Sequence, residues 1–327
     1  MRGCMLPRAP PARRQPLPVV LAILPFFALI FLGYAAGRTR LFDATALKGL
    51  NTFVFYIAMP PLLFRLAAGQ PLPAAPWRLL ASYALAELVT LVLAGLLLLR
   101  RGRRDPADAV VGGLAASFSN GVFMALPISV AVLGSTAALP ALLLIVLDSL
   151  FLFAAAVLAL ELLGAGRAGR GPRLRLAGLK PALLNPQVLA IVGGLAAALV
   201  GLSLPEVLEQ ILDLLGRAAA PCALVGLGAT LALGPARGLR GEVLVLVALK
   251  LAVLPALVWL GGSFLFRLPD HWLQVAVLAA GMPTGATAYV VARQYDRLVE
   301  PVSAAIVLST ALSLPSVSLL ILLLVPG

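Results

Sequence analysis

Three charged residues lie deep inside apolar stretches of the sequence and are the first candidates for chemistry. Glu87, Asp148 and Lys250 each stand about eight to ten residues into an apolar run; in a helix that is roughly 12–15 Å from its start. A charge at such a depth in a bilayer costs about 2.5–3.5 kcal/mol, so it normally faces a partner or a water-filled cavity. Glu87 and Lys250 can pair, either as a structural ion pair or as part of a coupling site. Asp148 has no evident basic partner in the sequence and is suited to carry a proton.

Polar residues gather near a proline in two of the apolar runs: Ser119, Asn120 and Pro127 in one, and Pro283, Thr284 and Thr287 in the other. A proline interrupts helical hydrogen bonding, and an interrupted helix leaves N–H groups and a positive dipole end that attract anions. Two such interruptions that meet would make a site for a carboxylate, with Asn120 and Thr287 as side-chain ligands. The simpler alternatives are that the prolines only kink their helices and that Asn120 makes a helix–helix hydrogen bond.

Membrane helices must position these residues. Of the 327 residues, 61% are hydrophobic and 12% are charged, and the mean hydropathy is +1.05. Soluble domains are about 45–50% apolar and about 25% charged, so a water-soluble enzyme and a nucleic-acid-binding protein are both excluded, despite the net charge of +12. The predicted fold is an all-α polytopic membrane protein with ten transmembrane helices. The ten apolar runs cover 17–36, 47–66, 79–99, 109–134, 139–163, 186–201, 208–233, 243–266, 272–292 and 302–325.

The distribution of basic residues predicts how these helices are oriented. Alternate loops on one side hold 16 lysines and arginines, and those on the other side hold seven, four of them in residues 1–16. We therefore expect a multi-pass protein of the cell inner membrane with both termini outside, a disordered basic tail over 1–16 and a cytoplasmic basic loop over 164–185. Two cysteines and one histidine are too few to indicate a disulfide framework or a metal site.

The first five apolar runs resemble the last five in the order of their features. Aligning Pro60 with Pro221 gives an offset of 161 residues, which also brings Glu87 within two residues of Lys250. Since five spans are an odd number, the second copy must be inverted in the membrane. Residues 17–163 and 186–327 are thus predicted to be two inverted five-helix repeats with broken helices 4 and 9, an arrangement that points to a secondary transporter with its site near the midplane.

Four segments resemble the auxin efflux carrier family, which includes plant carriers and bacterial malate and malonate permeases: FYIAMPPLLFRLAAGQP, SFSNGVFMALPISVAVLG, LLGRAAAPCALVGLGATLA and VLAAGMPTGATAYVVARQY. The resemblance covers about residues 20–325. It implies ten helices in two inverted repeats, helices 4 and 9 that cross at Pro127 and Pro283, Asn120 facing the substrate, and an elevator-like movement of a transport domain against a scaffold. Thr287 stands where the family often has asparagine, and Gly121 and Val122 replace its usual Thr-Gly. The bacterial short-loop form is the better match.

The predicted function is secondary active transport of a small organic anion, a mono- or dicarboxylate. No cofactor is expected; a proton or sodium gradient would drive transport, with Glu87, Asp148 or Lys250 as the coupling or charge-balancing groups. The expected partners are the anion and the lipid bilayer, with no nucleic acid, and a homodimer is left open. One alternative is a sodium-coupled organic-anion symporter of similar fold. Another is a membrane-embedded enzyme, which is disfavoured because no HExxH, GxSxG or aspartate-rich diphosphate motif is present.

Overall fold

The computed structural model describes residues 17–39, 41–69, 76–100, 105–164, 184–202, 204–233 and 241–324, with side chains from residue 24 onward. Within these ranges the regular structure is helical, apart from one isolated antiparallel bridge between Ser119 and Thr284. The predicted tail 1–16 and most of the predicted loop 164–185 lie outside them.

The first half of the chain forms α1 (Leu17–Arg38), α2 (Ala44–Phe53), α3 (Met59–Ala68), α4 (Pro76–Arg100), α5 (Pro106–Ser117), α6 (Leu126–Leu133), α7 (Ala138–Leu147) and α8 (Phe153–Leu162). The second half forms α11 (Pro186–Leu199), α12 (Glu206–Leu233), α13 (Gly241–Ala248), α14 (Leu254–Leu260), α15 (Asp270–Ala280), α16 (Ala286–Tyr295) and α17 (Val299–Leu324). Short π-helical turns are inserted at η1 (Val54–Ala58), η2 (Gly121–Ala125), η4 (Asp148–Leu152), η5 (Leu249–Val253) and η6 (Gly261–Leu265).

Because the π turns join one helix to the next, several elements form longer continuous helices. Six helices of the described residues are long and apolar enough to cross a membrane: Ala44–Ala68, Pro76–Arg100, Ser135–Leu162, Glu206–Leu233, Gly241–Leu265 and Val299–Leu324. Three shorter apolar helices cover Leu24–Arg38, Gly121–Leu133 and Pro186–Leu199. The protein is therefore a multi-pass, helical membrane protein.

Two of the ten predicted apolar runs contain a break in the helix, as expected for helices 4 and 9. The helix in run 109–134 stops after Ser117 and restarts at Gly121, which leaves a first break over Phe118–Asn120. The helix in run 272–292 stops after Ala280 and restarts at Ala286, which leaves a second break over 281–285. Pro283 lies inside the second break, as predicted. Pro127 does not lie in the first break: it is at the N-terminal end of α6, where the preceding π turn η2 leaves room for its ring.

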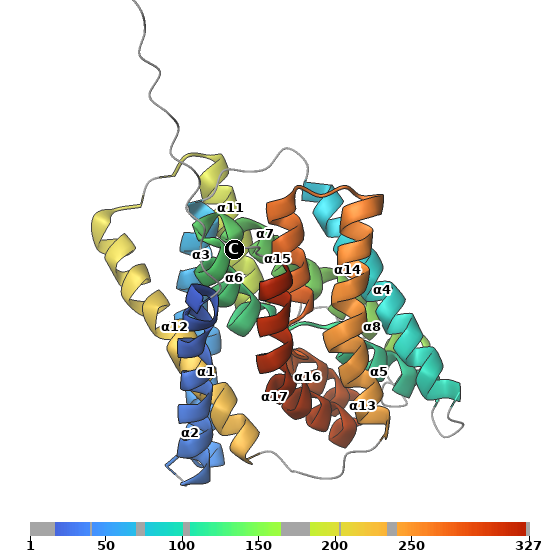
Figure 1. Cartoon of the computed structure of the whole chain (residues 1–327). Coiled ribbons are helices and arrows are strands. Elements are labelled where there is room, and N and C mark those ends of the chain that lie inside the picture. The colour runs from blue at the N-terminus through green and yellow to red at the C-terminus, as the bar shows by residue number, and fades with distance from the viewer. Residues whose placement is uncertain are drawn as a thin grey trace, which may run out of the picture.

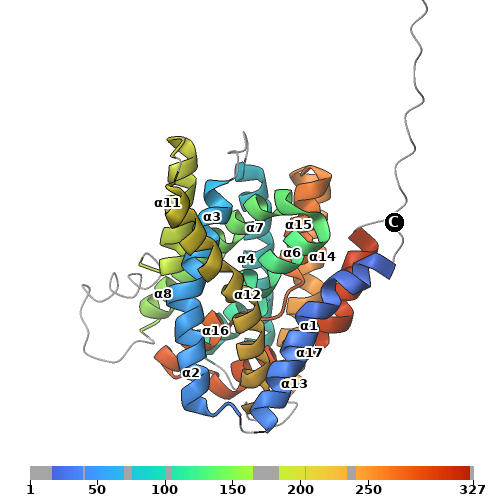
Figure 2. The ribbon, with the colours of Figure 1, turned by 90° about the vertical axis from the view of Figure 1, so that its left-hand side faces the viewer.

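The helices pack as two neighbouring groups (Figures 1 and 2). α1, α2, α3, α11 and α12 lie on one side, where α12 packs along α1 and α3, and α3 packs along α11. On the other side α4 packs against α5, α14 against α15, and α13 and α16 against α17. α6 and α7 lie between the groups and contact helices of both.

Glycines allow a close approach between α1 and α12. A Cβ atom placed on Gly228 would lie 1.9 Å from the carbonyl oxygen of Ile30, and one placed on Gly33 would lie 2.0 Å from the carbonyl oxygen of Val225. Such contact between backbones is typical of membrane helices, whose association depends on close packing of small residues. α1 is thereby fixed to α12 although 192 positions of the sequence separate Gly33 from Val225.

Candidate functional site

The two helix breaks are hydrogen-bonded to each other. The backbone N–H of Asn120 donates to the carbonyl oxygen of Pro283 at 2.9 Å, and the N–H of Gly285 donates to the carbonyl oxygen of Phe118 at 3.0 Å. These two bonds form an antiparallel bridge around Ser119 and Thr284. In a membrane, backbone groups freed by a helix break must find partners inside the protein, and here each break supplies the partner of the other.

Four helix ends consequently meet at the bridge. α5 and α15 end there with their carbonyl groups, whereas the helix Gly121–Leu133 and α16 begin there with their N–H groups. The first N–H groups of a helix have no acceptor within it and carry partial positive charge. The bridge region is thus surrounded by two positive and two negative helix ends.

Lys250 neutralises one of the negative ends. It lies in the π turn η5 between α13 and α14, and its side chain is fully buried. Its Nζ donates to the carbonyl oxygen of Ala280, the last residue of α15, at 2.6 Å, and to the Oγ of Ser119 at 2.9 Å. A cation at the C-terminal end of a helix stabilises that end, so Lys250 joins α13 and α14 to both breaks.

Tyr83 is a site residue that the sequence reasoning missed. Its Oη lies 3.1 Å from the Oγ of Ser119, and the side chain is buried. It precedes Glu87 by four residues on α4, and residues at that spacing share one helix face. This spacing was the signal that could have found it, because a tyrosine one turn from a buried carboxylate in an apolar helix needs a polar partner.

Glu87 and Asp148 bring two carboxyl groups to the same region. Both are buried, Glu87 on α4 and Asp148 in the π turn η4, and each interacts electrostatically with the other and with Lys250. The predicted direct Glu87–Lys250 pair does not form, because Lys250 donates to Ser119 and Ala280 instead. The two carboxyl groups lie close enough for one to hydrogen-bond the other when it is protonated, and within the described ranges no other residue donates to Glu87 or to Asp148 Oδ1. The cation near Asp148 is Lys250, a partner that the sequence did not indicate.

Asn120 and Thr287 keep their polar groups free for a ligand. The Asn120 side chain is only 7% exposed, and no hydrogen bond joins its carboxamide to the other residues that the structure describes. Thr287, half-buried in the first turn of α16, likewise has no hydroxyl partner within the described ranges. A carboxamide can donate and accept at once, so both residues can offer hydrogen bonds to a ligand beside the helix ends.

Thr284 lies in the second break, as predicted, and its polar groups are bonded to neighbouring helices. Its hydroxyl donates to the carbonyl oxygen of Ala115 at 2.9 Å, and its N–H donates to the Oγ of Ser309 at 3.1 Å. Its polar groups are thus engaged in holding the second break against α5 and α17. Ser309, on α17, was not singled out in the sequence, where nothing marks it among the other serines of that helix.

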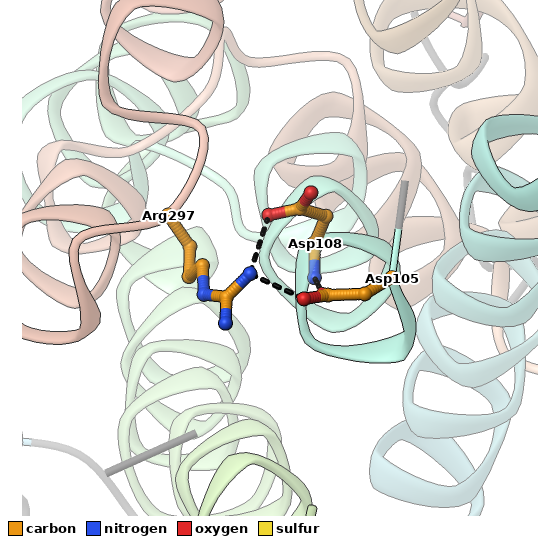
Figure 3. Close-up of polar contacts among 3 residues, drawn as sticks. All are labelled: Asp105, Asp108 and Arg297. Atoms are coloured by element: carbon orange, nitrogen blue, oxygen red, sulfur yellow. Dashed lines mark hydrogen bonds and ion pairs between the residues drawn. The ribbon is translucent and has the colours of Figure 1, made fainter. Parts of the chain in front are cut away.

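An ion-pair cluster joins the two helices that lie on one side of the bridge (Figure 3). Arg297, just after α16, pairs through Nη1 with Asp105 and, at 3.7 Å, with Asp108, both at the start of α5. The backbone on each side of Arg297 is left-handed, with φ of 55° at Asp296 and 48° at Leu298. Left-handed backbone is costly for residues with a side chain and persists where the surroundings enforce it. α5 and α16 are therefore tied at both ends, by the bridge and by this cluster.

Asp105 also caps α5. Its Oδ1 accepts a hydrogen bond from the N–H of Asp108 at 3.0 Å, as an N-terminal capping residue does. That hydrogen bond, followed by the Arg297 guanidinium, stabilises the charged carboxylate and holds the pKa of Asp105 below its ordinary value. Three charged side chains therefore fix one end of the helix pair.

No group of three or more histidine, cysteine, aspartate and glutamate side chains that could hold a metal ion occurs in the part of the chain that the structure describes. The free polar groups beside the bridge are instead amide, hydroxyl and backbone N–H donors. Such donors suit an anion, and the three buried charges lie next to them. The arrangement can therefore bind an anionic ligand.

Comparisons with known proteins show similarity to membrane transporters. The sequence matches the family described as Membrane transport protein over residues 18–168 and 174–321. It is 34% identical over 311 residues to the "Putative malonate transporter" of Rhizobium meliloti (strain 1021), covering 93% of this chain and 95% of that protein. It is 25% identical over 349 residues to "Auxin efflux carrier component 8" of Arabidopsis thaliana, covering 91% and 95%.

A third relative comes from an archaeon. It is an "Uncharacterized transporter" of Methanothermobacter thermautotrophicus, 27% identical over 303 residues, with 91% of this chain and 95% of that protein covered. The family match covers the positions of both helix breaks and of the three buried charges. The chain therefore belongs to the membrane transport protein family, that of the auxin efflux carriers, and is a multi-pass membrane transporter, not an enzyme.

Proposed function

We propose that the protein is a secondary active transporter of a small organic anion, a mono- or dicarboxylate. The observation that carries the proposal is the Asn120 carboxamide, which is buried but free of hydrogen bonds to the described residues and lies beside two helix N-terminal ends. Asn120, Thr287 and the N–H groups at these ends would bind the carboxylate. The substrate named for the relative from Rhizobium, malonate, belongs to this class.

The proposed architecture behind this activity is ten transmembrane helices in two inverted repeats, residues 17–163 and 186–327, that move like an elevator. Matched connections support the repeat. Arg297 follows Thr136 by the same 161 residues that separate Pro221 from Pro60. Thr136 follows α6 and its Oγ1 lies 3.1 Å from Nε2 of His271, at the start of α15. Arg297 follows α16 and binds the start of α5. In each repeat, the residue that follows the broken helix thus contacts the start of the corresponding helix in the other repeat.

Glu87, Asp148 and Lys250 are proposed to couple transport to an ion gradient. Burial of two carboxyl groups beside one ammonium group, with three carboxylate oxygens to which no other described residue donates, favours uptake of a proton during the transport cycle. A sodium ion bound by the same oxygens is the alternative, and dependence of uptake on sodium separates the two. Ser119 would transmit a change at this charge cluster to Asn120, because it contacts both Lys250 and Tyr83.

The proposed location is the cell inner membrane, with both termini outside, residues 164–185 in the cytoplasm, and two copies of the chain as a candidate assembly. Fusion of a reporter enzyme to either terminus tests the orientation. Activity of a periplasmic reporter at both ends is expected, and activity of a cytoplasmic reporter at either end would contradict it.

Uptake into proteoliposomes tests the function. Radiolabelled malonate, malate, lactate and indole-3-acetate are offered with and without a pH gradient. Asn120→Ala is compared with Asn51→Ala, which removes the same group from an exposed position on α2. We expect uptake of at least one acid by the wild type and by Asn51→Ala, and its loss in Asn120→Ala. Exclusion of every acid by folded, inserted protein would overturn the proposal.

A further inference from the structure

One serine of α17 holds the middle of the second helix break. Thr284 donates its backbone N–H to the Oγ of Ser309 at 3.1 Å, and the Ser309 hydroxyl in turn donates to the carbonyl oxygen of Ile306 at 3.2 Å. Thr284 is 1% exposed and Ser309 is completely buried, so these bonds are shielded from water. A backbone N–H that a helix break leaves without a helical acceptor must find one elsewhere in the protein. For Thr284 this acceptor is Ser309.

The position of Thr284 affects both breaks. The residues on either side of it are bonded to the first break, at Asn120 and Phe118. Thr287 lies three residues after Thr284, in the first turn of α16. A shift of Thr284 would therefore move the bonds to the first break together with the N-terminal end of α16. Both proposed side-chain ligands of the anion, Asn120 and Thr287, thus depend on where Ser309 holds the second break.

The first break has an equivalent acceptor. Ser119 is the partner of Thr284 in the bridge, and its backbone N–H is directed to the carboxylate of Asp148 by a hydrogen bond. Ser309 follows Asp148 by 161 residues, the offset of the proposed repeat. The middle residue of each break is therefore bonded to a corresponding position in its own half of the chain.

The two acceptors differ in their chemistry, because Asp148 can ionise and a serine hydroxyl stays neutral. Asp148 faces Tyr83 and Glu87 on α4 and Lys250 in η5. A change in protonation within this group alters how well Asp148 accepts the N–H of the first break. The bond between Ser309 and the second break has no such dependence.

We propose that Ser309 is a positioning residue of the anion site, which fixes the second break through Thr284 whatever the protonation state of Asp148. It acts on the substrate only through the break. The pH-dependent hold is thereby confined to the first break. This inference rests on the proposed transport function, because the site that Ser309 positions is the proposed anion site.

Binding of radiolabelled malonate to the full chain in detergent tests the proposal, with malate, lactate and indole-3-acetate measured in parallel. We expect Ser309→Ala to raise the dissociation constant about tenfold, the effect of losing one hydrogen bond, by the same factor at each pH. Ser309→Thr keeps the hydroxyl and should restore most of the affinity. A loss of affinity that is reversed by the returned hydroxyl distinguishes positioning from a mere change in packing.

Ser313→Ala is the matched control. Ser313 lies one turn after Ser309 on α17, is also completely buried, and donates its hydroxyl to the carbonyl oxygen of Thr310 in the same helix at 2.7 Å. The variant therefore removes the same group from the same helix without removing a bond to either break. It should bind malonate like the wild type.

Hydrogen–deuterium exchange measured by mass spectrometry tests the hold on the break without any substrate. Local opening of a segment speeds the exchange of its backbone N–H groups. Peptides that cover 281–287 should exchange faster in Ser309→Ala than in the wild type. In Ser313→Ala they should exchange as in the wild type.

Unchanged affinity in Ser309→Ala would overturn the proposal, whatever the result of the exchange measurement. Equal effects of Ser309→Ala and Ser313→Ala would overturn it in favour of a general loosening of α17. Faster exchange in Ser309→Ala alone, with no acid bound by the wild type, would support the hold on the break and count against the proposed transport function. If Ser309→Ala does not fold, Ser309→Cys takes its place, and its weakly accepting thiol should give a smaller effect in the same direction.

Discussion

Lys250 donates a hydrogen bond to the carbonyl oxygen of Ala280, the residue at which α15 ends, across 2.6 Å. A buried ammonium group thus sits at the negative end of a broken helix and, through Ser119, reaches the other break. The lysine is a structural partner of the bridge as well as the neighbour of Glu87 and Asp148. Its removal is therefore expected to affect folding before it affects coupling.

Lys250→Met removes the charge and both hydrogen bonds while keeping a long side chain. Loss of one partner from a buried charged group costs about 3–5 kcal/mol, so we expect a large fall in the melting temperature or no folded protein. Lys250→Arg keeps the charge, and its melting temperature should lie between those of Lys250→Met and the wild type. Thermal unfolding in detergent measures the difference. If Lys250→Met had the same melting temperature as the wild type, the ammonium group would not be needed to stabilise the two helix breaks.

Glu87→Gln and Asp148→Asn separate coupling from binding. If these carboxyl groups carry the coupling proton, uptake driven by a pH gradient should fall at least about tenfold, the scale of losing one coupling interaction. Exchange of labelled for unlabelled substrate without a gradient should continue. Glu300→Gln, which neutralises an exposed acid at the start of α17, should change neither rate. An equal loss of gradient-driven uptake and exchange would place the carboxyl groups in substrate binding instead.

Asp105→Asn tests the ion-pair cluster through its dependence on pH. The pKa of Asp105 is lower in the folded protein than its ordinary value, so its charge stabilises the fold above the unfolded pKa of about 3.9. That contribution is lost as the pH falls through the folded pKa. The melting temperature of the wild type should therefore fall below about pH 5 more steeply than that of Asp105→Asn. Asp270→Asn, at the exposed start of α15, is the control and should keep the wild-type slope; parallel curves for all three would contradict the prediction.

Gly228→Ala tests the contact between α1 and α12. The added Cβ would lie 1.9 Å from the carbonyl oxygen of Ile30, so the helices must separate, at a cost of about 1–3 kcal/mol. The melting temperature should fall. Gly49→Ala on α2, where no atom lies within 4 Å of the added Cβ, should leave it unchanged or raise it slightly. Similar melting temperatures for the two variants would mean that the close approach carries no stability.

Hydropathy was enough to predict a helical, multi-pass membrane protein, because a membrane helix must bury its backbone groups within one apolar segment. The polar residues near a proline in each half also predicted two breaks, since a proline inside an apolar run frees backbone groups that must bond elsewhere in the protein. The position predicted for the first break was wrong, because the break lies at Phe118–Asn120 and leaves Pro127 in α6. A wide π turn that accommodates a proline has no clear sequence signature.

The contacts between residues of the site were harder to predict from the sequence. Glu87 and Lys250 were recognised as unusual from their depth alone, but their expected pairing rested on opposite charge and on the repeat. The observed partner of Lys250 is a backbone carbonyl, at Ala280, and any residue type can supply one. Ser119 joins Lys250 and Tyr83 from a position 36 residues beyond one and 131 before the other, a relationship that only the fold can create.

The bridge between the breaks has a consequence for synthesis of the chain. The Asn120 N–H and the Phe118 carbonyl oxygen are bonded to residues more than 160 positions later. At about 5–20 residues per second, the ribosome needs roughly 8–33 s to make the 165 residues from Ser119 to Thr284. During that time the first break must wait in the translocon or the membrane without its partner. A chain that ends before Pro283 would keep this defect permanently, which makes it a ready target for membrane quality control.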